Sequence, residues 1–258
     1  GGLRAGDDPL RVQGKLMSSN IPHTAMVLAA GLGTRMRPLT DTCPKPLIEV
    51  GGKRLMDRMI DPLIEAGVQR IVVNVHWLAD QVEDHVSGIK GVDLIVSDER
   101  GEVLETGGAL VKAAPMLGDD PVFVVNTDAF WGNGDSRPFL DLANAFDPAQ
   151  MDEILLLADT QRSLGYGGAG DFLRAEDGSL KRRGENPSAP WAYAGVRILK
   201  PQAFSGLAVE RFSVAWRIWG PLVESGRLHG LPLDDFWLHV GDPDALKDAE
   251  MWLRCHGA

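Results

Sequence analysis

Short apolar runs alternate with amphipathic segments along most of the chain. The runs are rich in β-branched residues and almost wholly apolar, which is typical of strands that are covered on both faces of a sheet. They lie at 25–30, 70–75, 92–96, 121–126 and 153–158. Strands of this kind that are separated by helices form parallel sheets, so the pattern predicts an α/β fold.

Helices are predicted between the first three strands. Apolar residues recur at helical spacing from Leu55 to Leu63, and Gly67 supplies a stop after them. The same spacing from Leu78 to Val86 predicts a second helix.

The pattern changes after residue 160, where loops and short strands typical of a meander begin, with a turn at 176–179. The remaining predicted elements are a helix over 214–225, strands near 227–231 and 236–240, and a helix from Pro243 to about Cys255. We therefore expect one domain over 23–258, with a mostly parallel central sheet flanked by helices and a small β-rich portion.

Residues 1–22 mix glycine, proline and charged residues without the apolar core of a signal peptide, which predicts a flexible tail. We expect the natural start at Met17, with the residues before it coming from upstream. Along the chain, no apolar run approaches the roughly 20 residues that are needed to span a bilayer.

Composition narrows the classes of partner. The chain has 258 residues, and 26 Lys and Arg against 36 Asp and Glu give a formal net charge of −10. This disfavours nucleic-acid and anionic-membrane partners, which attract positive surfaces. Cys43 and Cys255 lie far apart and without metal-ligand spacing, which fits a reducing cytoplasm. The oligomeric state stays open between a monomer and a small homo-oligomer.

A glycine-rich loop follows the first predicted strand, at residues 31–34. Its two glycines let backbone amides approach an anion closely. Between Gly31 and Pro46 there are three cations and one acid, so the local charge is 3 − 1 = +2. The spacing is neither that of a P-loop nor the full Rossmann fingerprint. A phosphate site is predicted, and a simple tight turn is the alternative.

A carboxylate, Asp128, follows the predicted strand at 121–126. Open α/β sheets bind ligands in the crevice at the carboxyl ends of their strands. Mg²⁺ is commonly held by one or two carboxylates together with phosphate oxygens and water. Asp128 is therefore the candidate metal ligand, and an aspartate that only caps the next turn is the alternative.

The combination of LAAGLGTRMRPLT with PKPL resembles the signature of the sugar-1-phosphate nucleotidyltransferases. The resemblance implies one Rossmann-like, GT-A-like domain in which Arg35, Lys45 and Asp128 are catalytic. Asp128 would hold Mg²⁺, with Mn²⁺ as a second option. The implied nucleotide contacts are Ala30, Gly31, Leu32, Gly33, Thr34, Arg35, Lys45, Glu105, Thr106, Gly107 and Asn126.

The same family usually has a second metal-binding Asp in a Trp-x-Asp-x-Gly-Thr segment, where this chain reads WLHVGD and has His239. An imidazole suits softer ions than Mg²⁺. Three arrangements remain: His239 binds the ion directly or through water, Asp242 substitutes for it, or Asp128 holds the ion nearly alone. A histidine that only packs on Trp237 is the alternative without a metal.

The segments HWLADQVEDHV, LETGG, NTD, GAGDF, WAYAGVRIL and HVGDPDAL resemble one branch of the family over residues 24–254, the short N-acetylmuramate-1-phosphate uridylyltransferases of peptidoglycan recycling. The resemblance implies UTP and N-acetylmuramate 1-phosphate as substrates and a UDP-sugar and pyrophosphate as products. The implied sugar contacts are Gly170, Asp171, Glu185 and Gly195. The Glu-Lys-Pro segment of thymidylyltransferases and glucose uridylyltransferases is missing, which disfavours those relatives.

Other functions stay open at this point. A mannose- or heptose-1-phosphate guanylyltransferase has a similar pattern. A non-catalytic nucleotide-sugar sensor would keep the fold, although Arg35, Lys45 and Asp128 favour an enzyme. A Rossmann dehydrogenase would need an acid for the ribose about 20 residues beyond the glycines, and Glu49 lies near that distance.

Overall fold

The computed structural model describes residues 21–257, so most of the predicted tail, with the expected start at Met17, lies outside the described residues. The four parallel strands at the centre are β1 (Thr24–Leu28), β4 (Arg70–Val75), β5 (Asp93–Asp98) and β6 (Val122–Asn126). The other strands are β2 (Glu49–Val50), β3 (Lys53–Arg54), β7 (Ala129–Trp131), β8 (Glu153–Asp159), β9 (Ser163–Leu164), β10 (Phe172–Arg174), β11 (Leu180–Arg182), β12 (Trp191–Leu199), β13 (Leu228–Pro232) and β14 (Trp237–His239).

Helices and short 3-10 turns connect these strands. The helices are α2 (Asp57–Ala66), α3 (Ala79–Ser87), α4 (Glu105–Leu117), α5 (Arg137–Ala145), α6 (Val214–Arg217), α7 (Trp219–Glu224) and α8 (Pro243–His256). The 3-10 turns are η1 (Thr34–Met36), η2 (Leu39–Asp41), η3 (Lys45–Leu47) and η4 (Pro201–Phe204). No helix among the described residues is both long and apolar enough to cross a membrane.

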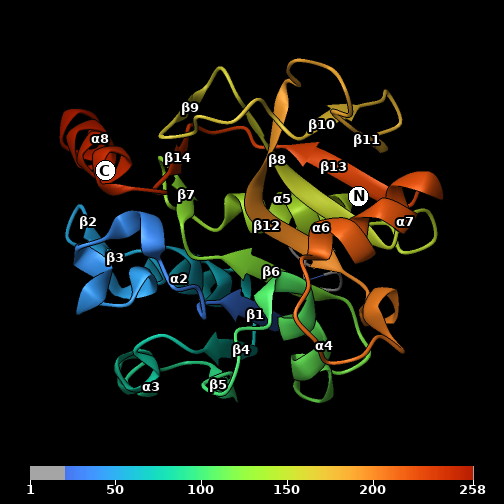
Figure 1. Ribbon diagram of the computed structural model, residues 1–258. Helices are drawn as coiled ribbons and strands as arrows, with labels where there is room; N and C mark the ends of the chain where they lie inside the picture. The colour runs from blue at the N-terminus through green and yellow to red at the C-terminus, as the bar shows by residue number, and fades with distance from the viewer. Residues whose placement is uncertain (1–20, 258) are drawn as a thin grey trace, which may run out of the picture.

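Within residues 21–257, nine strands form the central sheet, with the path β11-β10-β12-β6-β1-β4-β5 and with β8 and β13 attached beyond β12 (Figure 1). Neighbours from β6 to β5 run parallel, and β12 is antiparallel to both β6 and β8. The α/β fold with a large, mostly parallel sheet is confirmed. The hairpin of β10 and β11 and the three-stranded sheet β7-β14-β9 form the expected β-rich portion.

Successive residues of the central strands face opposite sides of the sheet, so the sheet separates two hydrophobic cores. Val27 of β1 and Phe123 of β6 pack into the core that is covered by α2, α3, α5 and α8. Met26 and Val124, one residue away on the same strands, pack into the core covered by α4, α6 and α7. Because both faces are covered, these strands carry apolar residues on both sides of the sheet.

The predicted helix over 214–225 is wrong in one respect, because the chain forms two short helices with a break at Ile218. Pro221 explains the break: it has no N–H for the carbonyl of Arg217, and its ring would clash with that carbonyl in a continuous helix. In the observed arrangement Pro221 lies in the first turn of α7, where proline is tolerated.

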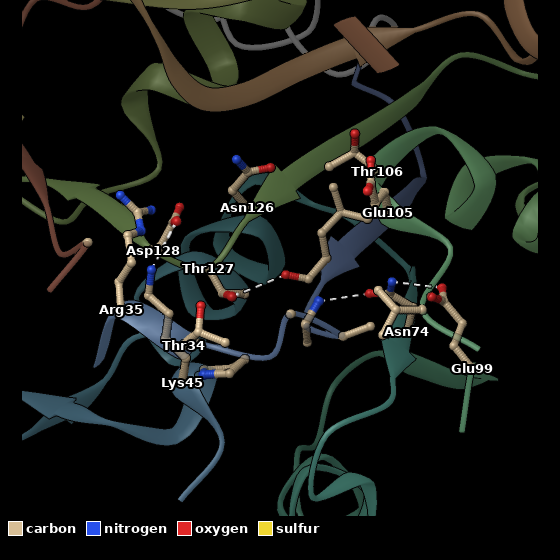
Figure 2. A pocket seen from close by; sticks show the side chains of 18 of the residues that line it. Thr34, Arg35, Lys45, Asn74, Glu99, Glu105, Thr106, Asn126, Thr127 and Asp128 are labelled. Carbon is tan, nitrogen blue, oxygen red and sulfur yellow. Dashed lines mark hydrogen bonds and ion pairs between the residues drawn. The ribbon is translucent and has the colours of Figure 1, made fainter. Parts of the chain in front are cut away.

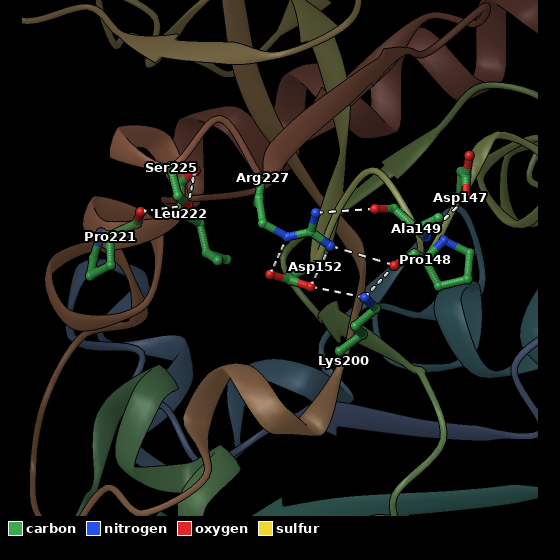
Figure 3. Close-up of polar contacts among 9 residues, drawn as sticks. All are labelled: Asp147, Pro148, Ala149, Asp152, Lys200, Pro221, Leu222, Ser225 and Arg227. Atoms are coloured by element: carbon green, nitrogen blue, oxygen red, sulfur yellow. Dashed lines mark hydrogen bonds and ion pairs between the residues drawn. The ribbon is translucent and has the colours of Figure 1, made fainter.

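A polar cluster ties together the ends of β8, β12 and β13 (Figure 3). Asp152 accepts hydrogen bonds from Nε and Nη2 of Arg227 (2.6 and 2.9 Å) and from Nζ of Lys200 (2.9 Å). Lys200 also donates to the carbonyl of Pro148. Hydrogen bonds from Arg227, with the charge of Lys200, lower the pKa of Asp152 from 3.8 to about 2.

Replacing Asp152 with Asn is expected to lower the free energy of unfolding at neutral pH by about 1–2 kcal/mol. Because the folded state depresses the pKa, this contribution is present above about pH 4 and is lost as the pH falls toward 2. Urea unfolding at several pH values should therefore show a flatter decline between pH 4 and 2 in the variant. Asp61→Asn, at an exposed ion pair with Lys53, is the control.

Candidate active site

A cavity of about 410 Å³ opens at the carboxyl ends of β1, β4 and β6. This is the edge where open parallel sheets bind ligands. Its lining consists of residues 28–31, 33–35, 45–46, 74, 99, 103, 105–106, 126–128, 213 and 241. Figure 2 shows Arg35, Lys45 and Asp128 at one end and Asn74, Glu99, Glu105 and Thr106 at the other. The two ends differ in chemistry and are described in turn.

The first end is built from the glycine loop and the turn η3. Gly33 has a φ of 61°, and its carbonyl accepts a hydrogen bond from the Thr40 hydroxyl (2.8 Å), which fixes the loop. Lys45 lies between two prolines that restrict the backbone, and its Nζ contacts Oδ2 of Asp128 at 3.0 Å. Exposed Arg35 projects from η1 into the same end, with no carboxylate in ion-pair contact among residues 21–257.

Asp128 is the carboxylate on which the cations of this end converge. Its burial would raise its pKa, but the charges of Lys45, His239 and Arg35 outweigh that effect and lower it. Asp128 is therefore ionised at neutral pH, with Lys45 as its counter-ion. The turn after β6 positions it, as the sequence predicts, and Thr127 Oγ1 donates to the carbonyl of Leu28 to anchor that turn (3.1 Å).

His239, at the end of β14, approaches Asp128 with its Nε2 3.9 Å from Oδ2. Its Nδ1 lies 3.2 Å from the carbonyl of Gly165, and since a carbonyl only accepts, Nδ1 carries a proton. In a neutral ring the lone pair then belongs to Nε2, on the side of Asp128. The ring packs on Trp237 and against the edge of Tyr166. The packing on Trp237 that the alternative requires is therefore present, and it leaves Nε2 on the side of Asp128.

Asp242 does not take the arrangement of a second metal ligand. Its Oδ1 accepts the backbone N–H groups of Asp244 and Ala245 and so caps α8. This disfavours the alternative in which Asp242 substitutes for His239. Between His239 and Asp242, Gly241 must lack a side chain, because a Cβ there would lie 2.7 Å from the imidazole.

The other end of the cavity contains a buried polar chain that the sequence did not reveal. Asn74 accepts the backbone N–H of Ala29 (2.7 Å) and donates to Oε1 of Glu99 (2.8 Å). The other oxygen of Glu99 accepts the N–H of Leu104 (3.2 Å). Burial raises the pKa of Glu99, although these hydrogen bonds oppose the rise. The sequence signal for this site is Asn74 itself, a polar residue in β4 between the apolar residues Val73 and Val75.

The start of α4 completes this end, and a distant segment holds it. Glu105 has an unusual φ of 57° for a residue with a side chain, and it pairs with Arg211 (2.8 Å). The N–H groups of Gly107 and Gly108 donate to the carbonyl of Phe212. A Cβ on Gly107 would lie 2.2 Å from the ring of Phe212. Gly107 therefore serves close packing of two segments.

The structure brings together most of the residues that were expected to bind the nucleotide. Those that line the cavity are Ala30, Gly31, Gly33, Thr34, Arg35, Lys45, Glu105, Thr106 and Asn126. Leu32 points outward with 42% of its surface exposed, and Gly107 lies behind the wall. Thr106 does not cap α4; its hydroxyl accepts the N–H of Val214 (3.0 Å). Glu49 of β2 is exposed and lies outside the cavity, which argues against the dehydrogenase alternative.

The four expected sugar contacts lie outside the cavity lining, in the β-rich portion and its connections. Oδ2 of Asp171 accepts the N–H of Tyr193 (2.9 Å), and Gly170 N donates to the Tyr166 hydroxyl (3.2 Å). Gly195 lies in the bulge of β12, with its α-carbon side against Asn126. Glu185 is exposed in the loop that follows β11. Gly195 is therefore the member of this set that adjoins the cavity wall.

A family model described as nucleotidyl transferase matches residues 24–254. The N-acetylmuramate α-1-phosphate uridylyltransferase of Caulobacter vibrioides is 44% identical over 239 residues, 91% of this chain and 98% of that protein. The protein of the same name from Neisseria meningitidis serogroup B is 34% identical over 233 residues, 88% of this chain and 96% of that protein. Mannose-1-phosphate guanylyltransferases match at lower identity, such as 29% for the catalytic subunit beta of Drosophila pseudoobscura pseudoobscura, of which the chain covers 59%.

Solved structures agree on the fold. HddC from Yersinia pseudotuberculosis, complexed with GMP-PN, has a TM-score of 0.71 at 21% identity and covers 90% of this chain and 99% of its own. The inositol-1-phosphate CTP transferase from T. maritima has a TM-score of 0.73 at 19% identity, with coverage of 90% and 95%. The family match and the 44% identity show more than the fold. The chain belongs to the nucleotidyl transferase family, among the sugar-1-phosphate nucleotidyltransferases.

Proposed function

We propose that this protein transfers the uridylyl group of UTP to N-acetylmuramate 1-phosphate. The observation that carries the proposal is the contact of Lys45 with Asp128 beside Arg35. These three residues lie at the end of the cavity that is built from the glycine loop and η3, which we assign to the phosphates. The high identity to two N-acetylmuramate α-1-phosphate uridylyltransferases over nearly their whole length supports the choice of substrates.

In this reaction a phosphate oxygen of the sugar 1-phosphate attacks the α-phosphorus of UTP. A new P–O bond forms, the bond from the α-phosphorus to the bridging oxygen breaks, and pyrophosphate leaves. Because the nucleophile is already an anion, no general base is needed. The task of the protein is to hold two anions together and to neutralise the charge that develops. Lys45 is assigned to the α-phosphate and Arg35 to the departing phosphates.

Asp128 and His239 fit a divalent cation as a pair, not as a complete set of ligands. No group of three or more His, Cys, Asp or Glu side chains suited to a metal occurs in residues 21–257. Mg²⁺ at nucleotide sites takes few protein ligands and completes its shell with phosphate oxygens and water. Bound here, the cation would neutralise phosphate charge. Asp128 would hold it, and Nε2 of His239 would be the second protein ligand.

Exchanging His239 for Asp is expected to lower the affinity for Mn²⁺ relative to Mg²⁺ by about tenfold, because imidazole favours transition metals and carboxylate suits Mg²⁺. Electron paramagnetic resonance of Mn²⁺ bound with UTP, titrated with Mg²⁺, measures the ratio without turnover. His23→Asp makes the same change at an exposed residue and should leave the ratio unchanged. An unchanged ratio in His239→Asp would exclude the residue as a ligand.

We assign the other end of the cavity, which Asn74 and Glu99 line, to the base of the nucleotide. This base-binding end suits a base that has a hydrogen-bond donor at its Watson–Crick edge. Both oxygens of Glu99 accept hydrogen bonds from the protein and keep further lone pairs for another donor. Uracil offers N3–H, whereas cytosine has only an acceptor at that position. Guanine also offers a ring N–H, so this feature alone leaves guanylyl transfer open, and identity to the two uridylyltransferases favours uracil.

The direct test is a panel of four nucleoside triphosphates against a panel of sugar 1-phosphates, with release of pyrophosphate as the readout. Release is expected with UTP and N-acetylmuramate 1-phosphate. Preference for GTP with mannose or heptose 1-phosphate would replace the proposal with guanylyl transfer. Binding of nucleotide without release in any combination would identify a sensor. Identification of the UDP-sugar by mass spectrometry confirms that transfer, not hydrolysis, releases the pyrophosphate.

A further inference from the structure

Arg183 directly follows β11 and is held by backbone carbonyls. Its Nε donates to the carbonyl of Gly170 (3.1 Å), and its Nη1 donates to that of Asn186 (2.9 Å). The backbone N–H of Arg183 donates to the carbonyl of Asp171 (2.8 Å). Its guanidinium is thus oriented by neutral acceptors and remains half-buried, with donor positions left over.

Arg183, like Arg174 of β10 and Arg182 of β11, is held by backbone carbonyls, whereas other arginines of this acidic chain are neutralised by carboxylates. Arg197 pairs with Glu153, Arg211 with Glu105 and Arg217 with Glu210. In the part of the chain that the structure describes, Arg183 has no acidic partner within 4.0 Å. A cation that is oriented but uncompensated is suited to binding an anion from outside the protein.

A series of contacts connects Arg183 to Asp128 at the catalytic end of the cavity. Nε2 of His239 lies 3.9 Å from Asp128, and the imidazole contacts the edge of Tyr166 with ring centroids 6.2 Å apart. The Tyr166 hydroxyl accepts the N–H of Gly170, whose carbonyl holds Arg183. The imidazole of His239 and the ring of Tyr166 therefore lie between Asp128 and the Gly170 turn that holds Arg183.

The Gly170 turn that holds Arg183 is tightly constrained. Gly170 has a φ of 80°, and a Cβ there would lie 2.0 Å from the carbonyl of Ala189. Hydrogen bonds from Ala189 N to Ala169 O and from Asp171 N to Trp191 O (both 2.7 Å) fasten the turn to the start of β12. The guanidinium is therefore positioned before any ligand binds, which reduces the entropy lost on binding.

We propose that Arg183 binds the carboxylate of the acceptor sugar and thereby selects a carboxylated sugar phosphate. The inference rests on the proposed function, because N-acetylmuramate carries a lactyl carboxylate that N-acetylglucosamine lacks. A guanidinium fits a carboxylate with two parallel hydrogen bonds. Arg35 and Lys45 are assigned to the triphosphate. Arg182, the neighbouring cation, instead donates to the carbonyl of Ala215 and stacks on Trp216.

The test compares two acceptors, N-acetylmuramate 1-phosphate and its lactyl methyl ester, which differ by one charge. The wild-type protein should prefer the acid in kcat/KM by about 10- to 100-fold, since a hydrogen bond to a charged group is lost in the ester. Arg183→Gln should bring this ratio near one, with KM for UTP unchanged. Arg174→Gln is the matched control, because Arg174 of β10 is also held by a carbonyl, that of Gly230, toward β13.

An acid-to-ester ratio that stays at the wild-type value in Arg183→Gln would overturn the proposal. An equal loss with the acid, the ester and N-acetylglucosamine 1-phosphate would also overturn it, because Arg183 would then act on the phosphate or on the fold. Calorimetric binding of N-acetylmuramate to the wild-type and variant proteins supplies a readout without turnover. If the wild-type protein forms no UDP-sugar from any acceptor, both the proposed function and the role of Arg183 are wrong. If it forms the UDP-sugar but the acid-to-ester ratio does not depend on Arg183, only the role of Arg183 is wrong.

Discussion

Lys45→Ala is expected to lower kcat for pyrophosphate release by about 10²- to 10³-fold, the usual effect of removing a charged group aimed at a transition state. Lys45 is 12% exposed and is held between two prolines, so a water molecule cannot replace it with the same geometry. Its loss also leaves the Asp128 carboxylate without the 3.0 Å partner that balances its charge.

Single-turnover measurement of pyrophosphate release, with saturating UTP and acceptor, isolates this effect from binding. Lys247→Ala is the control, since Lys247 is an exposed residue of α8 that pairs with Asp244 one turn earlier in the helix. Asp128→Asn should show a comparable loss. The proposed mechanism would be contradicted if either Lys45→Ala or Asp128→Asn kept the wild-type kcat while its free energy of unfolding was also unchanged.

Arg197→Met is expected to lower the free energy of unfolding by about 3–5 kcal/mol, because it leaves a buried carboxylate without its counter-ion. Arg197 of β12 and Glu153 of β8 are 1% and 0% exposed, with 3.3 Å between Nε and Oε1. Trp219 donates to the same oxygen of Glu153 (2.8 Å), and the guanidinium carbon lies 5.7 Å from the ring centroids of both Tyr193 and Trp219. Burial raises the pKa of Glu153 in spite of Arg197, because a charged carboxylate is unfavourable away from water.

Urea unfolding of the variant and of the double variant Glu153→Leu with Arg197→Met separates two causes. The double variant should regain most of the loss, since a well-packed apolar pair can replace a buried ion pair. Arg70→Ala, which removes an exposed pair with Asp93, should change the free energy by less than about 1 kcal/mol. An equal loss in the single and double variants would mean that packing of the arginine stem, and not its charge, is the source.

The elements that the sequence predicts well are those in which one pattern decides the structure. Strand β4 is predicted at its observed bounds because it is covered on both faces, and most of its residues are apolar and β-branched. Gly67 ends α2 with a φ of 103°, a conformation that favours glycine. The apolar spacing does not predict the break at Ile218 because it continues across it, whereas Pro221 removes a hydrogen bond from the preceding turn.

For the site, local motifs identified the end of the cavity where the glycine loop, Lys45 and Asp128 each follow a strand or lie near one in sequence. The other end, lined by Asn74 and Glu99, depends on tertiary contacts. Glu99 follows a strand as an ordinary acidic residue, and only the folded chain shows that it is buried against Asn74. Ser213 joins the wall from more than 100 residues away, because Phe212 packs on Gly107.

The contact between Gly107 and Phe212 also bears on how base preference can change during evolution or design. The wall at this end is a joint product of two segments, 104–108 and 210–214, whose backbones are hydrogen-bonded and too close for a methyl group. A loop transplanted from a relative with another base would bring one half of that wall without its counterpart. Changes of base preference that preserve the fold should therefore require paired substitutions in both segments. Residues 104–108 and 210–214 would then have to be exchanged together.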